Sequence, residues 1–268
     1  MIRWNRFALG VMVLWAGMAV LGPLLPLSPN QMDLDRMMQG PMATQWLGYD
    51  DLGRSIIQRL VAGSAISFFV ALIVVSISLS VGTLIGTFSA YRGGSVDAVL
   101  VRVFDVFLAF PGILLVIALA GLLGPGLDNL IIAMTSVGWV GYARLARAQV
   151  LTLKHRDHVL AAIALGTGPW RIMWRHLVPL ISAPMVVEAT FGIAAVILAE
   201  AGLSFLGLGV QAPDSSWGGM IRDGAQFMLH SSHMVLVPGI MLALVVLSIN
   251  LLGDQLRDWF DVRSRRSP

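Results

Sequence analysis

Residues 157–179 read DHVLAAIALGTGPWRIMWRHLVP and lie between two apolar segments that are each long enough to cross a membrane. The stretch is basic and helix-forming, and it is too polar to span a bilayer itself. A pair of small residues, Ala161 and Ala162, precedes Gly166, and Pro179 lies thirteen residues beyond that glycine. Glycine commonly ends helices, so we expect one short helix to stop near Gly166 with a positive φ at the glycine.

A second short helix is predicted directly after this turn. Pro169 suits the first turn of a helix, where its missing N–H costs nothing. The residues that follow place an apolar face at i, i+3, i+4, i+7 spacing, made of Trp170, Met173, Trp174 and Leu177. Such a face fits the groove of a partner protein. It equally fits the headgroup layer of a membrane, and periodicity alone leaves both interpretations open.

The composition identifies an integral membrane protein. Hydrophobic residues make up 57% of the 268-residue chain, charged residues 12%, and the mean hydropathy is +0.80. Soluble domains carry roughly 25% charged residues. The chain has no cysteine, which excludes disulfides and thiolate metal sites. The net charge of +3 comes from basic residues in loops beside apolar segments, so no nucleic-acid partner is expected.

We predict an all-α protein with about six spans, each near the ~20 residues that a helix needs to cross the hydrocarbon core. The expected spans are residues 7–27, 67–90, 101–123, 127–145, 183–203 and 234–252. Residues 1–27 would form the N-terminal tip and a retained first span, 28–64 an outer segment, 65–253 a core of five spans, and 254–268 a tail. Within the core, 146–182 would form an inner loop and 204–233 an outer loop.

The distribution of basic residues predicts the orientation. Placing both termini in the cytosol puts most Lys and Arg residues on the cytosolic side, as the positive-inside rule requires. The exceptions are Arg36, Arg54, Arg59 and Arg222. Residues 28–64 and 204–233 would then face the outside.

Two outer stretches carry further motifs. The first, QWLGYDDLGRSIIQRL at residues 45–60, has glycines that allow turns, Gly48 and Gly53, and an acidic pair that starts at Asp50. We expect Asp50 or Asp51 to pair with Arg54 or Arg59. An ordinary helix capped by one of these acids is the simpler interpretation, and both can hold together. The second, residues 203–218, contains Ser204, Gly207, Gly209, Pro213, Trp217 and Gly218.

These motifs, with GYAR at 141–144 and NLLGDQLRD at 250–258, resemble the ABC importer permeases for dipeptides, oligopeptides and nickel, and specifically their second or "C"-type permease. Residues 157–179 are similar to the "EAA" loop of that family, although Leu160 occupies its acidic position. By this resemblance the loop residues that couple to an ATPase are Asp157, Leu160, Ala161, Ala162, Gly166, Pro169, Trp170, Met173, Trp174 and Pro179.

The resemblance implies a type I importer permease of the bacterial inner membrane. It implies a heterodimer with a homologous permease, two cytosolic ABC ATPases and an extracytoplasmic solute-binding protein. ATP and magnesium would be held by the ATPases, so this chain would need no cofactor of its own and would not be an enzyme. The expected substrate is a short peptide, with nickel or a nickel chelate as the alternative.

Polar residues inside predicted spans are functional candidates by default. Glu188 is the candidate for the transport pathway, whereas Asp105 and Glu200 are expected to have structural roles. His230 and His233 form a weak candidate metal pair, and Gly82 with Gly86 predicts close helix packing. An intramembrane hydrolase is a remote alternative, because the sequence has no G-x-S-x-G and no H-E-x-x-H motif.

Overall fold

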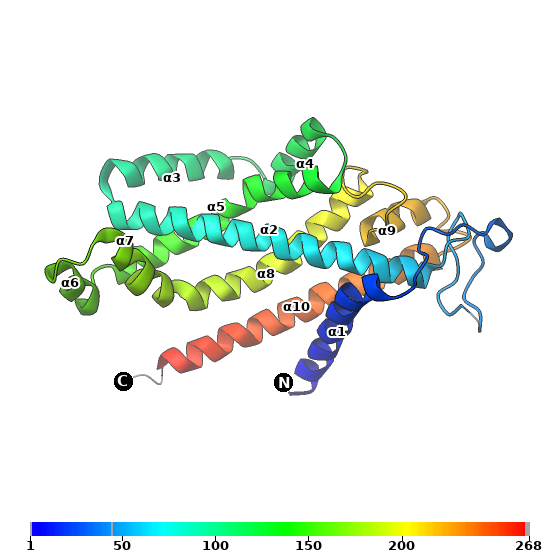
Figure 1. Cartoon of the computed structure of the whole chain (residues 1–268), viewed down its shortest axis with the longest axis horizontal. Helices are drawn as coiled ribbons and strands as arrows, with labels where there is room; N and C mark the ends of the chain where they lie inside the picture. The colour runs from blue at the N-terminus through cyan, green and yellow to red at the C-terminus, as the bar shows by residue number, and fades with distance from the viewer. Residues whose placement is uncertain (1, 44, 266–268) are drawn as a thin grey trace. The chain divides into compact units, whose positions relative to one another are not determined.

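A computed structural model describes residues 2–43 and 45–265, with side chains described for 6–43 and 45–260. It is all-helical, with no β-strand among the described residues. Figure 1 labels the helices, which are α1 (Ile2–Leu21), α2 (Ile56–Arg92), α3 (Gly94–Leu108), α4 (Gly112–Leu123), α5 (Leu127–Leu153), α6 (Asp157–Ala164), α7 (Pro169–Ile172), a π-helical segment (Met173–Leu177), α8 (Val178–Phe205), α9 (Trp217–Ala225) and α10 (His233–Arg265).

Four helical stretches in the described part of the chain are long and apolar enough to cross a membrane. They are Arg6–Leu24, Ile56–Arg92, Pro169–Phe205 and His233–Phe260, and the pair α3 and α4 adds a fifth if it forms one span. Helix α5 covers the remaining predicted span with 27 residues, but it is not among the stretches that are apolar enough.

One predicted span needs correction. Residues 101–123 do not form one continuous helix, because α3 and α4 meet at a bend of 81°. Proline explains the break: Pro111 has no N–H to donate and disfavours helical geometry at Phe110. The Pro111 carbonyl instead accepts the first backbone hydrogen bonds of α4, from Leu114 and Leu115.

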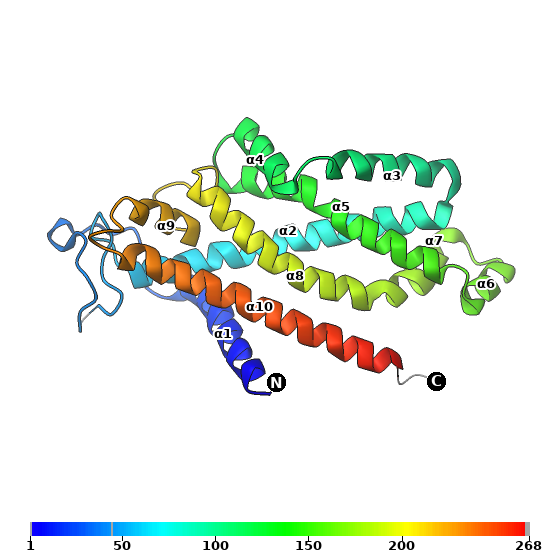
Figure 2. The same ribbon diagram turned by 180° about the vertical axis from the view of Figure 1, so that it is seen from behind.

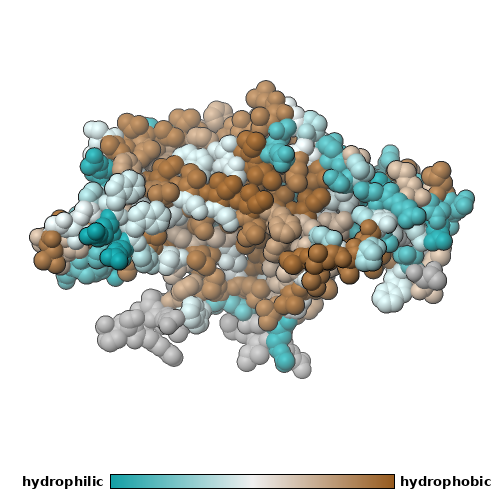
Figure 3. Space-filling view, viewed as in Figure 1, coloured by the Kyte–Doolittle hydropathy of each residue, from teal (hydrophilic) through white to brown (hydrophobic). Residues whose placement is uncertain are grey.

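The chain divides into two compact units. The first contains Met1–Ile73, Ile117–Ala133 and Ile193–Leu252. The second contains Val74–Val116, Met134–Gly192 and Gly253–Pro268. The core of the first unit packs α1, the start of α2, α9 and parts of α8 and α10 around Trp15, Ile56, Ile197, Trp217 and Ile249. Polar residues gather over residues 28–55, which precede α2, whereas the helices carry mostly hydrophobic side chains (Figure 3).

The second unit holds α3, the latter part of α2 and most of α5 together. Phe104 is buried against Val140 and Ala143. At Gly82 and Gly86 the backbone of α2 approaches α5 so closely that an added Cβ would meet backbone atoms of Trp139 or Ala143. The predicted close packing at this glycine pair is therefore confirmed. Helix α6 lies past the end of α5 in both views (Figures 1 and 2).

Candidate functional site

The predicted turn at Gly166 is present. Helix α6 ends at Ala164, and Gly166 adopts φ +78°. The Gly166 N–H donates to the Ile163 carbonyl at 2.9 Å, and the Thr167 N–H donates to the Ala162 carbonyl at 3.0 Å. This pair of hydrogen bonds is a Schellman motif, which needs a left-handed residue at the position that Gly166 occupies. The sequence prediction for this residue is confirmed.

Helix α6 has one buried side and one exposed apolar side. Val159 and Ala162 are buried within the chain. Leu160, Ile163 and Leu165 are 46%, 45% and 86% exposed. We call these three side chains the α6 apolar surface. Asp157 lies in the first helical turn, where a negative charge is favourable, and Ala161 is exposed.

The helix after the turn starts as predicted but faces partly inward. Pro169 occupies its first turn, and Trp170 stacks on Phe88 with ring centroids 6.4 Å apart. Trp170 and Trp174 remain 58% and 52% exposed, whereas Met173 is only 4% exposed. Met173 is therefore not available to a partner, and that part of the predicted docking face needs correction. Leu177 is likewise buried, and Pro179 is exposed in the first turn of α8.

The outer motif before α2 forms a buried charge network. Gly48 and Gly53 have φ of +78° and +70°. Asp50 pairs with Arg54 at 2.7 Å and with Arg59 at 3.4 Å. The expected capping of the helix by these acids is wrong, because α2 begins at Ile56 and has no acidic residue in its first turn.

Asp50 also organises the backbone of this turn. Its Oδ1 accepts the N–H groups of Leu52 at 3.0 Å and Arg54 at 2.8 Å. Arg54 reaches Asp51 at 3.5 Å as well. Burial, together with the neighbouring Asp50 charge, raises the pKa of the Asp51 carboxyl. The predicted pairing of these acids with the two arginines is confirmed.

The second outer motif ties α9 to α2. Trp217 is fully buried, and its Nε1 donates to the Leu60 carbonyl at 2.9 Å. Gly218 lies directly against the backbone of Ala201, where a Cβ would not fit. Gly207 has φ +82°, and Gly209 lies against Ser204. Pro213 follows in the same loop, joined to Ala212 by a cis peptide bond.

Comparison with known proteins gives the family. The family described as "Binding-protein-dependent transport system inner membrane component" matches residues 82–266. A dipeptide transport system permease protein of Alkalihalophilus pseudofirmus is 41% identical over 92% of this chain and 82% of its own length. The chain belongs to this family. It is a membrane-embedded permease subunit of an ABC importer.

Two further comparisons agree with this assignment. A nickel transport system permease protein of Escherichia coli K12 is 39% identical, covering 97% of this chain and 94% of its own. The solved structure entitled "Inward facing conformations of the MetNI methionine ABC transporter" has a TM-score of 0.58 at 19% identity. It covers 76% of this chain and 95% of that chain, and at this identity it supports the fold alone.

The remaining candidates of the permease differ in their surroundings. Glu200 is fully buried, and Ser67 and Ser204 each donate to it at 2.9 Å, which is a structural arrangement. Glu188 is exposed on α8. His233 Nε2 lies 3.2 Å from the Tyr49 carbonyl, and His230 is exposed. The described residues contain no group of three or more His, Cys, Asp or Glu side chains that could hold a metal ion.

Sequence reasoning missed a second charge cluster. Arg147 donates to both carboxylate oxygens of Asp97, at 2.6 and 2.7 Å, and Ser89 donates to the same carboxylate at 2.6 Å. The Nζ of Lys154 donates to the Ala90 carbonyl at 2.9 Å. Arg147 and Asp97 lie 50 positions apart, so no local spacing could have indicated their pairing.

Proposed function

We propose that this permease transports short peptides and couples to its ATPase through α6. The substrate class is supported by the relatives, because the permeases of A. pseudofirmus and of Bacillus subtilis at 41% and 40% identity are named for dipeptide transport. The alternative, nickel, has support from the names of two relatives at 39% identity. A partner permease of the same family would complete the pathway.

The α6 apolar surface carries the proposal for coupling. Leu160 and Ile163 belong to α6 and Leu165 is its C-cap residue; the helix is held by a defined turn and lies past the end of α5. Exposed apolar residues that gather on a rigid helix are typical of a protein contact site. Trp170 and Trp174 add exposed aromatic area after the turn, and aromatic residues dominate the energy of such contacts.

ATP binding by the partner subunits would bias an equilibrium between inward- and outward-open states. The α6 turn is suited to transmit this movement because it connects α5 to α8 through a short and well-defined segment. The exposed segment before α2 would receive the solute-binding protein. With the orientation that the basic residues predict, both termini would be cytosolic. ATP and magnesium would be held entirely by the ATPases.

Substrate and coupling are tested separately. Cells that lack the chain are supplied with the wild type and assayed for uptake of a labelled dipeptide and of radioactive nickel. Dipeptide uptake that depends on the chain supports the peptide assignment, whereas uptake of nickel alone overturns it.

Coupling is tested with Leu160→Asp and with a matched control, Leu34→Asp, at a leucine that is 67% exposed outside the α6 segment. The tagged permease is solubilised, and the retained ATPase is quantified. Leu160→Asp should lower ATPase retention and uptake together, and Leu34→Asp should leave ATPase retention unchanged. Normal retention in Leu160→Asp would contradict docking through α6.

A further inference from the structure

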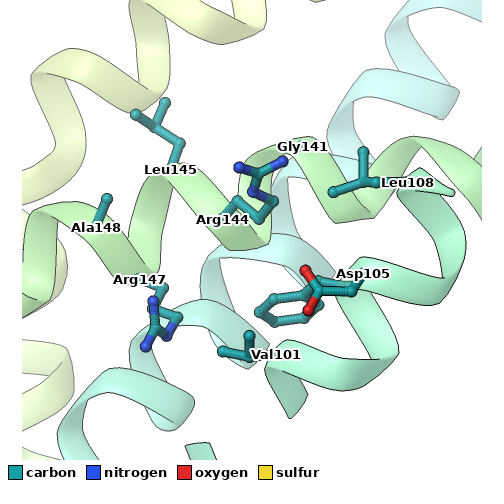
Figure 4. Close-up of a pocket in the computed structure, with 9 residues that line it drawn as sticks. Val101, Asp105, Leu108, Gly141, Arg144, Leu145, Arg147 and Ala148 are labelled. Carbon is teal, nitrogen blue, oxygen red and sulfur yellow. The ribbon is translucent and has the colours of Figure 1, made fainter. Parts of the chain in front are cut away.

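A pocket of about 480 Å³ lies between α3 and α5 in the second unit. Its walls include the apolar side chains of Val101, Leu108 and Leu145, and its charged side chains include Asp105 and Arg144 (Figure 4). The assigned coupling segment and the outer motifs contribute no residue to it, and only Gly141 and Arg144 belong to a motif, the GYAR of residues 141–144. The proposed peptide transport therefore leaves this pocket without a role.

The pocket presents one free positive and one free negative group. Arg147, which also lines it, is neutralised by the bidentate pair with Asp97. Arg144 and Asp105 are both exposed, and within the described part of the chain neither side chain makes a hydrogen bond or an ion pair. Figure 4 shows the Arg144 side chain on α5 and the Asp105 side chain on the neighbouring α3, and both residues line the pocket.

The length of α2 indicates that one end of the helices around this pocket reaches beyond the hydrocarbon core. Helix α2 has 37 residues and is roughly 55 Å long, well beyond the ~30 Å hydrocarbon core, so its end turns lie outside that core. Asp97, in the first turn of α3, is tied to Ser89 near the end of α2. Val99 and Val106 on α3 are 62% and 63% exposed, which suits contact with acyl chains.

We propose that this pocket binds the headgroup of phosphatidylethanolamine. The phosphate oxygens would accept charge-assisted hydrogen bonds from the Arg144 guanidinium. The ammonium group would donate to the Asp105 carboxylate, and the acyl chains would lie along the exposed valines of α3. Basic side chains between membrane helices are known to bind lipid headgroups, and in this pocket Arg144 is the unpaired basic group.

The pairing of charges selects this headgroup over other common ones. A phosphatidylglycerol headgroup carries no cation and would leave Asp105 beside a phosphate. A phosphatidylcholine headgroup carries a cation but has no N–H to donate to Asp105. Of these three headgroups, only ethanolamine supplies both a phosphate acceptor for Arg144 and a positively charged N–H donor for Asp105.

The test measures lipids retained by the permease, purified from membranes with the subunits that accompany it. Native mass spectrometry follows the exchange of retained lipid against added phosphatidylethanolamine, phosphatidylcholine or phosphatidylglycerol. The wild type should retain phosphatidylethanolamine preferentially. Arg144→Gln should weaken this retention about tenfold, since a hydrogen bond to a charged group is lost. Asp105→Asn should remove the preference over phosphatidylcholine.

The matched control is Arg102→Gln, at an exposed arginine of α3 that does not line the pocket. It should retain lipid as the wild type does. Equal retention of all three lipids by the wild type would overturn the proposal. This comparison uses the wild type alone, so it does not depend on whether any variant folds. Displacement of the lipid by inorganic phosphate alone would show a simple anion site and would also overturn it. Equal losses of lipid retention in Arg144→Gln and Arg102→Gln would also overturn the proposal.

Discussion

The turn at Gly166 offers the most direct test of how α6 is held. Gly166 adopts φ +78°, and no atom lies within 4 Å of the position where a Cβ would be placed. A substitution here therefore acts through the backbone conformation and not through steric contact with neighbours. We predict that Gly166→Ala and Gly166→Val loosen the end of α6 while the spans stay folded.

The size of the effect follows from the left-handed conformation. For a residue other than glycine this conformation costs roughly 1–2 kcal/mol. The cost is higher for Val than for Ala because the β-branched side chain is bulkier at positive φ. A change of 1–2 kcal/mol alters a local equilibrium by a factor of about 5–30. Gly166→Asn is the matched control, since asparagine tolerates this conformation better than other residues.

Amide hydrogen exchange on the solubilised permease measures the local equilibrium. The informative amides are those of residues 166 and 167, which donate to Ile163 and Ala162. Exchange at residue 167 should accelerate about 5- to 30-fold in Gly166→Ala, more in Gly166→Val and less in Gly166→Asn. ATPase retention should fall in the same order. If Ala, Val and Asn variants all exchange at the wild-type rate, the turn does not depend on the left-handed glycine.

Three other outcomes are expected. Asp50→Ala leaves Arg59 buried without its partner and should destabilise the permease by about 3–5 kcal/mol in thermal unfolding, whereas Asp50→Glu should recover part of the loss. Gly86→Ala should reduce the amount of folded protein in membranes, because its Cβ would meet the α5 backbone, and Gly121→Ala, where nothing lies within 4 Å, should not. A C-terminal alkaline phosphatase fusion should be inactive and a fluorescent protein fusion bright; the opposite pair of results would contradict a cytosolic C-terminus.

Local patterns predicted local features well. The positive φ predicted at Gly166 and the turns predicted at Gly48 and Gly53 follow from the conformations that only glycine adopts readily, and all three residues have positive φ. The pairing of Asp50 with Arg54 joins residues four positions apart, so the sequence itself brings them close. Gly82 and Gly86 predicted a close helix contact from their spacing, although not that α5 would be the partner.

Predictions failed where the outcome depended on which side of a helix faces the rest of the chain. Trp170 and Met173 lie on the same predicted apolar face, yet only Met173 is buried, because periodicity cannot distinguish an apolar face turned inward from one left exposed. Hydropathy predicts a continuous span over 101–123, whereas the structure breaks it between α3 and α4, next to Pro111. Hydropathy describes where a segment prefers to lie and carries no information about backbone geometry.

The sequence by itself determined that the chain is an all-helical membrane permease of the importer family, since composition, apolar runs and local motifs each depend on residues near one another. Only the tertiary structure decided the contacts between distant residues. Ser67 and Glu200 are 133 positions apart, and Asp97 and Arg147 are 50 apart. The same holds for the pocket that leaves Arg144 and Asp105 without partners. Helix packing in a membrane depends on side-chain shape and hydrogen bonding more than on the hydrophobic effect, so hydropathy along the chain could not have revealed these contacts.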